Sequence, residues 1–260
     1  MQELRNKVAV ITGSGRGIGA VIAYKLAMEG AKIILWDKNN TFLKKRQEEL
    51  KKHQDVEIYI TQVDVSDRLQ VEKAKDMTLE KFDTIDILIN NAGICRVCPI
   101  NELDEATWDQ IIDTNLKGVY LSSNAFIPQM IKQKSGKIVN ISSMAGKIGG
   151  RWMTAYSAAK AGVIGFTKSL AREVAKYNIN VNCVCPGIVP TQLWHECITD
   201  HAKKIGIEKK SVNSYYISNI PLGRLCTPED VSNIVFFLVS TASSYMTGQA
   251  LNITGGQQMD

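Results

Sequence analysis

Tyr156 and Lys160 stand four positions apart in a stretch whose apolar residues recur with a helical period. At that spacing two side chains share one face of a helix. A lysine cation beside a phenol favours the phenolate and lowers a pKa that is ordinarily about 10. A tyrosine tuned in this way can take a proton from an alcohol or return one to a ketone. We therefore expect Tyr156 to be the general acid/base of an oxidoreductase, the alternative being an ordinary surface pair.

Ser143 follows the apolar run Gly136–Ile141, which has the length of a strand. Its hydroxyl could hydrogen-bond a substrate oxygen and stabilise the charge that develops there during the reaction. A serine pair at a strand end means little by itself, and so does a lone Tyr-x-x-x-Lys. Their occurrence together with a glycine-rich turn earlier in the chain favours a catalytic role for Ser143, Tyr156 and Lys160.

The glycine-rich turn, Thr12–Gly19, lies between a predicted strand and a predicted helix. Its small residues let the backbone approach a pyrophosphate, and the N-terminus of the following helix offers free N–H groups and a positive dipole end. Glycine also makes ordinary tight turns, but a position between a strand and a helix favours a nucleotide. The residues expected to bind the dinucleotide here are Gly13, Arg16, Gly17, Ile18 and Gly19.

Asp37 ends the second predicted strand, about 20 residues past the glycine-rich turn, where an acidic side chain can accept hydrogen bonds from the adenosine ribose hydroxyls. A carboxylate at that place repels a 2′-phosphate, so NAD is expected in preference to NADP. Arg16 and Lys38 argue in the other direction, because either cation could meet a 2′-phosphate. A helix-capping role for Asp37 is also compatible with the sequence.

Apolar runs of strand length alternate with longer stretches of helical period, which predicts a parallel sheet with helices on both faces. One doubly wound, Rossmann-type α/β domain is expected over residues 1–260, with seven strands in the order 3-2-1-4-5-6-7. The strands are predicted at Val8–Thr12, Lys32–Trp36, Val56–Gln62, Ile85–Asn90, Gly136–Ile141, Ile179–Val184 and Ala250–Ile253. The helices are predicted at Gly17–Glu29, Thr41–His53, Arg68–Lys81, Thr107–Lys132, Thr154–Lys176 and Pro228–Ser240.

Some helix ends have their own signals. Gly30 is expected to stop the first helix, and the segment Thr227–Asp230 supplies a cap, a proline and first-turn acids to the last one. The segment 189–222 has mixed polarity and several aromatic residues, and it interrupts the regular alternation. We expect it to form a lid over the substrate.

The bulk composition excludes several classes of protein. A hydrophobic fraction of 45% and a charged fraction of 22% are typical of a soluble chain with a sizeable core. The formal charge of +5 is spread over mixed-charge helix faces, so no nucleic acid is expected as a partner. No apolar run approaches the roughly 20 residues that cross a bilayer. The first residues do not resemble a signal peptide, so a cytoplasmic location is expected.

Six cysteines raise the question of a metal or disulfide site. Cys183 and Cys185 alternate within a predicted strand, which places both on one face as small hydrophobic residues. Cys95 and Cys98 form a C-x-x-C without the second, histidine-rich half of a zinc site. No metal is expected.

These residues and motifs together resemble the short-chain dehydrogenase/reductase family across nearly the whole chain. The motifs that carry the resemblance are the turn Thr12–Gly19, the segment 90–93 (Asn-Asn-Ala-Gly), Asn115, Ser143, the pair Tyr156 and Lys160, and Pro186-Gly187. Serine and tyrosine are thirteen positions apart, which is the family spacing and the reason for choosing Ser143 over Ser142.

The resemblance implies further site residues. Asp64 and Val65 would flank the adenine, Asn91, Ala92 and Gly93 would line the floor of the cofactor site, and Lys160 would also hold the nicotinamide ribose. Asn115 would position a water that leads protons from Lys160 to solvent. Ile188 and Thr191 would contact the nicotinamide carboxamide, and Pro186 and Gly187 would also bind the cofactor. The resemblance also implies a homotetramer.

Segments of the predicted lid and C-terminus resemble sorbitol-6-phosphate 2-dehydrogenases and acetoin or diacetyl reductases. The expected small-molecule substrate is therefore a small polyol, a polyol phosphate or an acetoin-like hydroxyketone. Polar and aromatic lid residues would suit a hydroxylated substrate, the alternative being that they pack and exclude water; they are Trp194, His195, Tyr215 and Tyr216. The candidate phosphate contacts, which could also simply solvate the lid, are Lys203, Lys204, Lys209 and Lys210. A 3-oxoacyl-thioester reductase is the enzymatic alternative, although NADP would normally accompany it. A nucleotide-sensing protein without chemistry is the non-enzymatic alternative.

Overall fold

A seven-stranded parallel sheet forms the centre of the molecule in the computed structural model, which describes residues 2–53 and 56–260. The strand order is β3-β2-β1-β4-β5-β6-β7, so the predicted order is confirmed. Strands β1 and β4 lie at the centre, and every pairing is parallel. The strands are β1 Val8–Thr12, β2 Lys32–Asp37, β3 Ile58–Gln62, β4 Ile87–Asn90, β5 Gly136–Ile141, β6 Ile179–Pro186 and β7 Ala250–Ile253.

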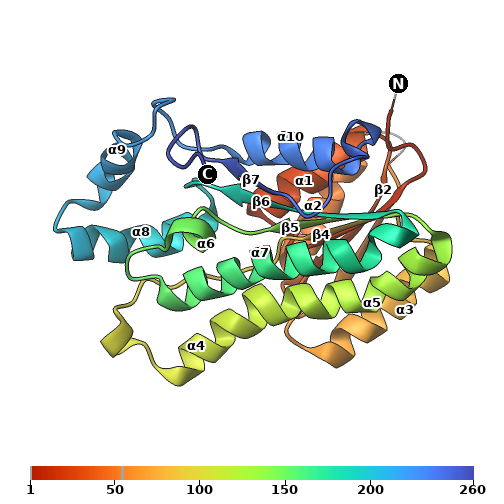
Figure 1. The fold of residues 1–260 in the computed structure, drawn as a ribbon, viewed down its shortest axis with the longest axis horizontal. Helices are drawn as coiled ribbons and strands as arrows, with labels where there is room; N and C mark the ends of the chain where they lie inside the picture. The colour runs from red at the N-terminus through yellow and green to blue at the C-terminus, as the bar shows by residue number, and fades with distance from the viewer. Residues whose placement is uncertain (1, 54–55) are drawn as a thin grey trace.

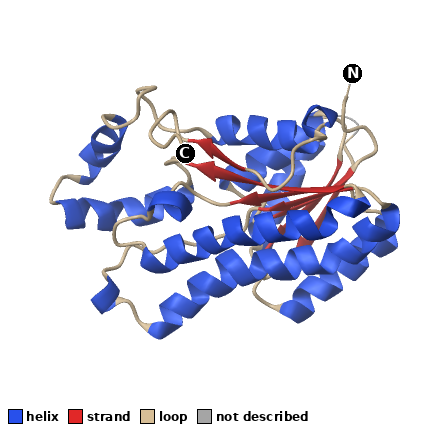
Figure 2. Cartoon of the chain, in the orientation of Figure 1, coloured by secondary structure: helices blue, strands red, loops and turns tan. Residues whose placement is uncertain are grey.

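Helices cover both faces of this sheet (Figures 1 and 2). One face carries α1 Gly17–Met28, α2 Asn40–Lys51 and α10 Pro228–Val239, and the other carries α3 Arg68–Phe82, α5 Gly118–Gln133 and α7 Thr154–Val174. Alternate residues of a strand face opposite layers: Ile33 and Leu35 pack with the first group, whereas Ile34 and Trp36 pack with the second. The sheet is therefore buried on both sides, as a parallel sheet requires.

Both predicted helix-end signals are present. Gly30 follows α1 with a φ of 89°, in the left-handed region that glycine enters most readily, and its N–H donates to the Ala27 carbonyl at 2.9 Å. Thr227 caps α10 through a reciprocal pair of bonds with Asp230, with Pro228 in the first turn. Local chemistry thus sets where these helices begin and end.

The predicted helix Thr107–Lys132 is wrong as a single regular element. The structure has α4 Glu105–Ile112, a five-residue π turn Asp113–Lys117 and then α5. Asn115 lies within the π turn and is fully buried, and its Nδ2 donates to the Ile111 carbonyl at 2.8 Å. Helical periodicity does not reveal one inserted residue, which is why the sequence predicted a continuous helix.

The segment 189–222 contains helices that mixed polarity concealed. These are α8 Gln192–Ile205 and α9 Val212–Ile217, joined through a 3₁₀ turn at Lys209–Ser211. They lie beyond the carboxyl ends of the strands (Figure 1). The short helix α6 Ala145–Ile148 follows β5. Among the helices of the described ranges, none combines the length and apolar character that a membrane crossing would need.

Helix α6 packs tightly against the backbone of α7. A Cβ at Gly146 would lie 2.7 Å from the carbonyl carbon of Lys160 and 2.9 Å from the amide nitrogen of Ala161. These backbone atoms cannot move without displacing α7. By contrast, a Cβ at Gly165, further along α7 and exposed, would meet nothing within 4 Å.

We predict that Gly146→Ala lowers the free energy of unfolding by about 1–3 kcal/mol, because the added methyl overpacks the α6–α7 contact. The matched control Gly165→Ala is expected to raise it by about 0.5–1 kcal/mol, since alanine is the better helix former. Urea unfolding of both variants measures the two changes. Equal effects of the same sign would contradict the packing argument.

Candidate active site

A cavity of about 530 Å³ opens at the carboxyl ends of the strands, the edge at which sheets of this kind bind ligands. The structure brings nearly all of the sequence-predicted site residues to its wall. Those that line it are Gly13, Arg16, Gly17, Ile18, Asp37, Asp64, Val65, Asn91, Ala92, Gly93, Asn115, Ser143, Tyr156, Lys160, Pro186, Gly187, Ile188 and Thr191. Gly19 is the exception, because it packs against the Asn91 side chain behind the turn.

The glycine-rich turn is held by the loop after β4. Asn91 Nδ2 donates to the carbonyls of Thr12 at 3.0 Å and of Gly13 at 2.9 Å. Gly13 has a φ of 61°, and a Cβ there would lie 2.7 Å from the Ala92 Cα. Gly17 has a φ of 59°, and a Cβ there would make ordinary contact with the Thr191 side chain at 3.6 Å. The glycines therefore let the turn pack closely and bring its backbone to the cavity wall.

Asp37 and Arg16 lie at the nucleotide end of the cavity. The Asp37 carboxylate accepts from the backbone N–H of Gly15 at 3.0 Å and of Asn39 at 2.9 Å. The Arg16 guanidinium forms an ion pair with Glu196 of α8 at 3.1 Å and lies 5.3 Å from the centre of the Phe42 ring. Arg16 thus links the glycine-rich turn to the lid segment, a contact that the sequence did not indicate.

Tyr156 and Lys160 share the inner face of α7. Their relative exposures are 9% and 4%, and Lys160 Nζ lies 5.7 Å from the centre of the Tyr156 ring. The ammonium donates to the Ile141 carbonyl at the end of β5, at 2.8 Å. This bond aligns α7 with the strand that carries Ser143.

The expectation that Lys160 lowers the Tyr156 pKa is wrong for this structure. Burial raises the pKa of Tyr156 well above its usual range, and the hydrogen bond with Ser143 opposes this only in part. Burial also lowers the pKa of Lys160 to about 8. Both groups are removed from water, and desolvation is the largest influence on the pKa of each. At neutral pH, Tyr156 holds its proton and is a hydrogen-bond donor.

The two serines at the end of β5 have different surroundings. Ser142 donates its hydroxyl to the Lys160 carbonyl at 2.8 Å, which commits it to holding α7. Ser143 Oγ accepts from the Ala145 N–H at 3.1 Å and hydrogen-bonds with Tyr156. The geometry therefore agrees with the choice of Ser143, made from spacing, as the serine beside the phenol.

Asn115 reaches the site because of the π turn. Its Oδ1 accepts from the Ile94 N–H at 3.2 Å, and its Nδ2 donates to the Ile94 carbonyl at 2.9 Å. A Cβ at Gly93 would lie 2.6 Å from Asn115 Oδ1 and 3.5 Å from Lys160 Nζ. Glycine at position 93 thus leaves room for the amide and the ammonium to lie near each other.

The lid departs from the sequence prediction at one histidine. Trp194, Tyr215 and Tyr216 line the cavity as expected, but His195 is exposed and lies outside its lining. His201, which sequence reasoning did not select, lines the cavity and is 5% exposed. Only knowledge of which face of α8 turns inward could have distinguished the two histidines.

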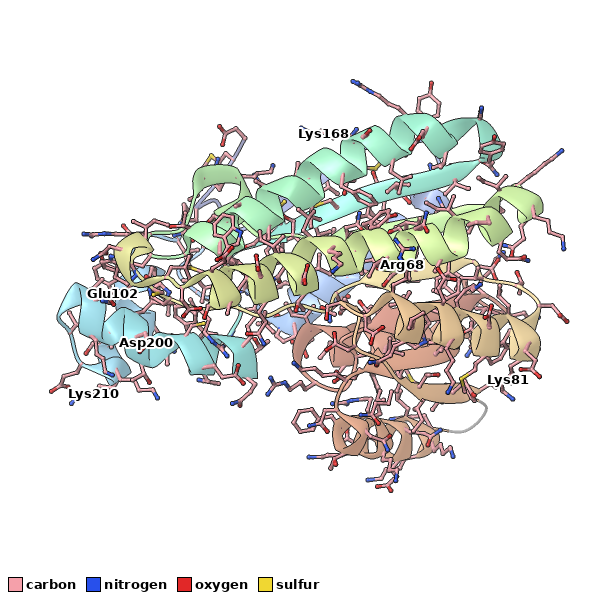
Figure 3. All side chains as sticks on the ribbon, turned by 90° about the horizontal axis from the view of Figure 1, so that it is seen from below. Arg68, Lys81, Glu102, Lys168, Asp200 and Lys210 are labelled. Atoms are coloured by element: carbon pink, nitrogen blue, oxygen red, sulfur yellow. The ribbon has the colours of Figure 1, made fainter. Side chains whose placement is uncertain are left out.

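The lid lysines also lie away from the cavity. Lys204 pairs with Glu102 at 3.4 Å and Lys210 with Glu208 at 2.8 Å, and none of Lys203, Lys204, Lys209 and Lys210 belongs to the cavity lining. Figure 3 shows Lys210 at the outer end of the lid helices. Because these lysines lie outside the cavity lining, the structure does not favour the sequence-based expectation that they contact a substrate phosphate.

The cysteines are free thiols. Cys183 and Cys185 point to the same side of β6 with their sulfurs 3.9 Å apart, as the strand pattern predicted. Cys95 and Cys197, which the sequence did not connect, are both buried in the cluster that contains Tyr156. Within residues 2–53 and 56–260, no group of three or more His, Cys, Asp or Glu side chains could hold a metal ion.

The doubly wound sheet, the glycine-rich turn and the buried tyrosine at one cavity define an oxidoreductase of the dinucleotide-binding α/β class. A sequence profile described as short chain dehydrogenase matches residues 7–202. The chain therefore belongs to the short-chain dehydrogenase/reductase family, as the motifs predicted.

Individual relatives extend over the same length. The chain is 40% identical over 253 residues to the 3-oxoacyl-[acyl-carrier-protein] reductase FabG of Chlamydia muridarum, covering 97% of this chain and 98% of that protein. A structure of NAD⁺-bound xylitol dehydrogenase superposes with a TM-score of 0.94 at 33% identity, over 98% of this chain and 100% of the other. A levodione reductase structure gives 0.92 at 32% identity, over 97% and 98%.

The family uses a nicotinamide cofactor, and the residues of the cavity fit one. Gly13, Gly17 and Thr191 line the cavity, and Asp37 lies at the end of β2 beside the turn. When bound, the nicotinamide ring would supply or accept the hydride of an alcohol–ketone conversion. The chain's own residues then have to handle only the proton.

Lys160 should leave a signature in the pH dependence of stability. Its pKa is about 8 in the folded chain against 10.5 for an ordinary lysine, so above pH 8 the unfolded state binds more protons. Below pH 8 the folded state therefore bears the full free-energy cost of the buried charge. As the pH rises from about 8 to about 10, Lys160 loses its proton in the folded state, and the free energy of unfolding increases.

We predict that Lys160→Met flattens this rise. The stability of the variant relative to the wild type should therefore be highest near pH 7 and lowest near pH 10. Thermal unfolding at several pH values measures the difference. Lys168→Met, on the exposed side of the same helix (Figure 3), is the control and should keep the wild-type slope. A wild-type slope in both variants would contradict a buried, charge-bearing Lys160.

Proposed function

We propose that the chain is an NAD-dependent oxidoreductase that interconverts a secondary alcohol and a ketone, with Tyr156 as the general acid/base. Its substrate is a small polyol, a polyol phosphate or an acetoin-like hydroxyketone. The observation that carries the proposal is the buried Tyr156 phenol, which lies beside Ser143 and Lys160 on the cavity that the glycine-rich turn also lines.

Proton transfer follows from the state of these side chains. In ketone reduction, the protonated Tyr156 hydroxyl donates its proton to the carbonyl oxygen, while Ser143 hydrogen-bonds the same oxygen. In alcohol oxidation, Tyr156 must first lose its proton, which burial opposes, so oxidation is favoured by alkaline conditions. Lys160 orients the site through Ile141 and lies between the phenol and Asn115. A proton path through water at Asn115 is part of the proposal.

Two contacts support NAD over NADP. Asp37 places a carboxylate beside the turn, where it disfavours a 2′-phosphate. Arg16, the cation that sequence analysis left as an NADP contact, is engaged by Glu196. A second carboxylate therefore lies near the same end of the cavity. The NAD⁺-bound state of the xylitol dehydrogenase neighbour points in the same direction.

A 3-oxoacyl-[acyl-carrier-protein] reductase is the second candidate, because curated relatives at up to 40% identity carry that name. The polyol and hydroxyketone proposal is supported instead by the aromatic and polar lining contributed by Trp194, His201, Tyr215 and Tyr216. A cytoplasmic homotetramer also remains a proposal, based on the family resemblance. A sensor without chemistry would not need Tyr156, Lys160, Ser143 and Asn115 at one cavity.

A substrate screen tests the proposal. Purified protein is assayed with NAD and xylitol, sorbitol 6-phosphate or 2,3-butanediol, and in the reverse direction with NADH and either acetoin or a 3-oxoacyl thioester. We predict faster turnover of a polyol or hydroxyketone than of the thioester. Tyr156→Phe should lower kcat by about 10²–10⁴-fold, the range for loss of a general acid/base, while NADH still binds.

Binding of NADH by Tyr156→Phe, followed by fluorescence, separates loss of chemistry from loss of fold. Near-normal turnover by this variant would refute the acid/base assignment. A thioester rate above all other rates would select the second candidate. If the wild type binds the cofactor but turns over none of these compounds, the result would favour the nucleotide-sensing protein without chemistry.

Cofactor preference gives a separate prediction. Asp37→Asn keeps an acceptor for the Gly15 N–H but removes the charge, so the ratio of NADPH to NADH affinity should rise by about tenfold. Glu196→Gln should raise the ratio less, since it frees an exposed Arg16 whose ion pair is weak.

The control is Glu208→Gln, which removes a lid carboxylate that pairs with Lys210. Titration of each variant with NADH and NADPH measures the ratio. A wild type that binds NADPH more tightly than NADH would show that the Asp37 argument is wrong.

A further inference from the structure

Helix α8 presents a stripe of side chains to the cavity. Trp194, Cys197, His201 and Ile205 follow one another at intervals of three or four residues, and all of them line it. Cys197 packs in the same cluster as Tyr156. His201 is four residues further along, about 6 Å along the helix axis at 1.5 Å per residue. The stripe therefore leads from the acid/base to a more distant part of the cavity.

His201 is fixed at that distant part by its neighbours. Its Nδ1 lies 3.1 Å from the Tyr216 hydroxyl, and its ring lies 5.3 Å from the Trp194 ring, centre to centre. Trp194 is itself held by a bond from its Nε1 to Asn213 Oδ1 at 2.9 Å. Three aromatic rings thus join α8 to α9 and hold the imidazole in one orientation.

The other nitrogen of this ring is left unsatisfied. Nε2 of His201 is buried and has no hydrogen-bond partner among the described residues. A buried polar atom without a partner costs free energy that a bound ligand can recover. His201 lines the cavity and is 95% buried, so its ring, whose Nε2 is covered by its neighbours, is the part of this wall with a hydrogen bond still to make.

The chemistry of the ring selects the ligand group. Burial lowers the pKa of His201, so the imidazole is neutral at neutral pH. A neutral imidazole bonded to Tyr216 through Nδ1 presents either a donor or an acceptor at Nε2, depending on its tautomer. A hydroxyl pairs with both forms, whereas an anionic oxygen can only accept and a methylene pairs with neither.

We propose that His201 Nε2 binds a hydroxyl of the substrate several bonds away from the carbon that reacts at Tyr156. His201 is then a specificity-determining residue that selects polyhydroxylated, unphosphorylated substrates over alkyl or acyl chains. This inference rests on the proposed function and narrows its substrate class. The position of the lid lysines outside the cavity lining agrees with a neutral substrate.

The test compares two alcohols of equal carbon number that differ in their distal hydroxyls, xylitol and 2-pentanol, with NAD as the oxidant. In His201→Phe we expect kcat/KM for xylitol to fall by about 10- to 100-fold, mainly through KM, as for a buried hydrogen bond to substrate. The value for 2-pentanol should stay within about twofold of the wild type. His201→Gln, which keeps a donor and an acceptor, should recover part of the loss for xylitol.

His195→Phe is the matched control, because it places the same substitution at an exposed position of the same helix. NADH affinity and melting temperature of each variant show whether the lid remains folded. Tyr216→Phe gives a second, milder variant that removes only the hydroxyl bonded to Nδ1. This variant should lower kcat/KM for xylitol more than kcat/KM for 2-pentanol.

Three results would overturn the inference, and they are distinct. Equal losses for xylitol and 2-pentanol in His201→Phe and Tyr216→Phe would make His201 a packing residue and leave the proposed function intact. A wild type that oxidises 2-pentanol as well as xylitol would also show that no distal hydroxyl is read. A wild type that oxidises neither alcohol, yet reduces the acyl thioester, would overturn the proposed function and this inference together.

Discussion

Two hydrogen bonds join the carboxyl end of β5 to α7 at a single residue, Lys160. Its carbonyl accepts from Ser142 and its ammonium donates to the Ile141 carbonyl, both at 2.8 Å. Burying an ammonium without such a partner costs free energy, so this bond fixes the position of α7 relative to β5. Gly146 lies against the same backbone and closes the contact from the other side. Tyr156, one turn earlier on α7, takes its place from this junction.

The burial that fixes this junction also sets its chemistry. Removal from water disfavours the charged form of both groups, so Tyr156 retains its proton more strongly and Lys160 releases its own more easily than in solution. At neutral pH the Tyr156 phenol therefore keeps its proton and is a hydrogen-bond donor. The neighbouring Ser143 hydrogen bond moderates the effect on the phenol without reversing it.

Helix α8 connects the parts of the cavity. Its outer side carries Glu196, which pairs with Arg16 of the nucleotide-binding turn, and its inner side carries Cys197 and His201. The same short element thus touches the cofactor end, the acid/base and the distant aromatic wall.

The sequence by itself determined the sheet and its strand order, because apolar runs of strand length, the Thr227 cap and the Thr12–Gly19 turn are local signals. Nearly all of the cavity wall followed from the family resemblance that the motifs carry, including the spacing from Ser143 to Tyr156. Only the tertiary structure decided which face of α8 turns inward, and so replaced His195 by His201. It alone revealed the π turn at Asn115 and the raised Tyr156 pKa. The physical reason is that desolvation and side-chain pairing depend on what packs against a residue from distant parts of the chain, which periodicity along the sequence does not record.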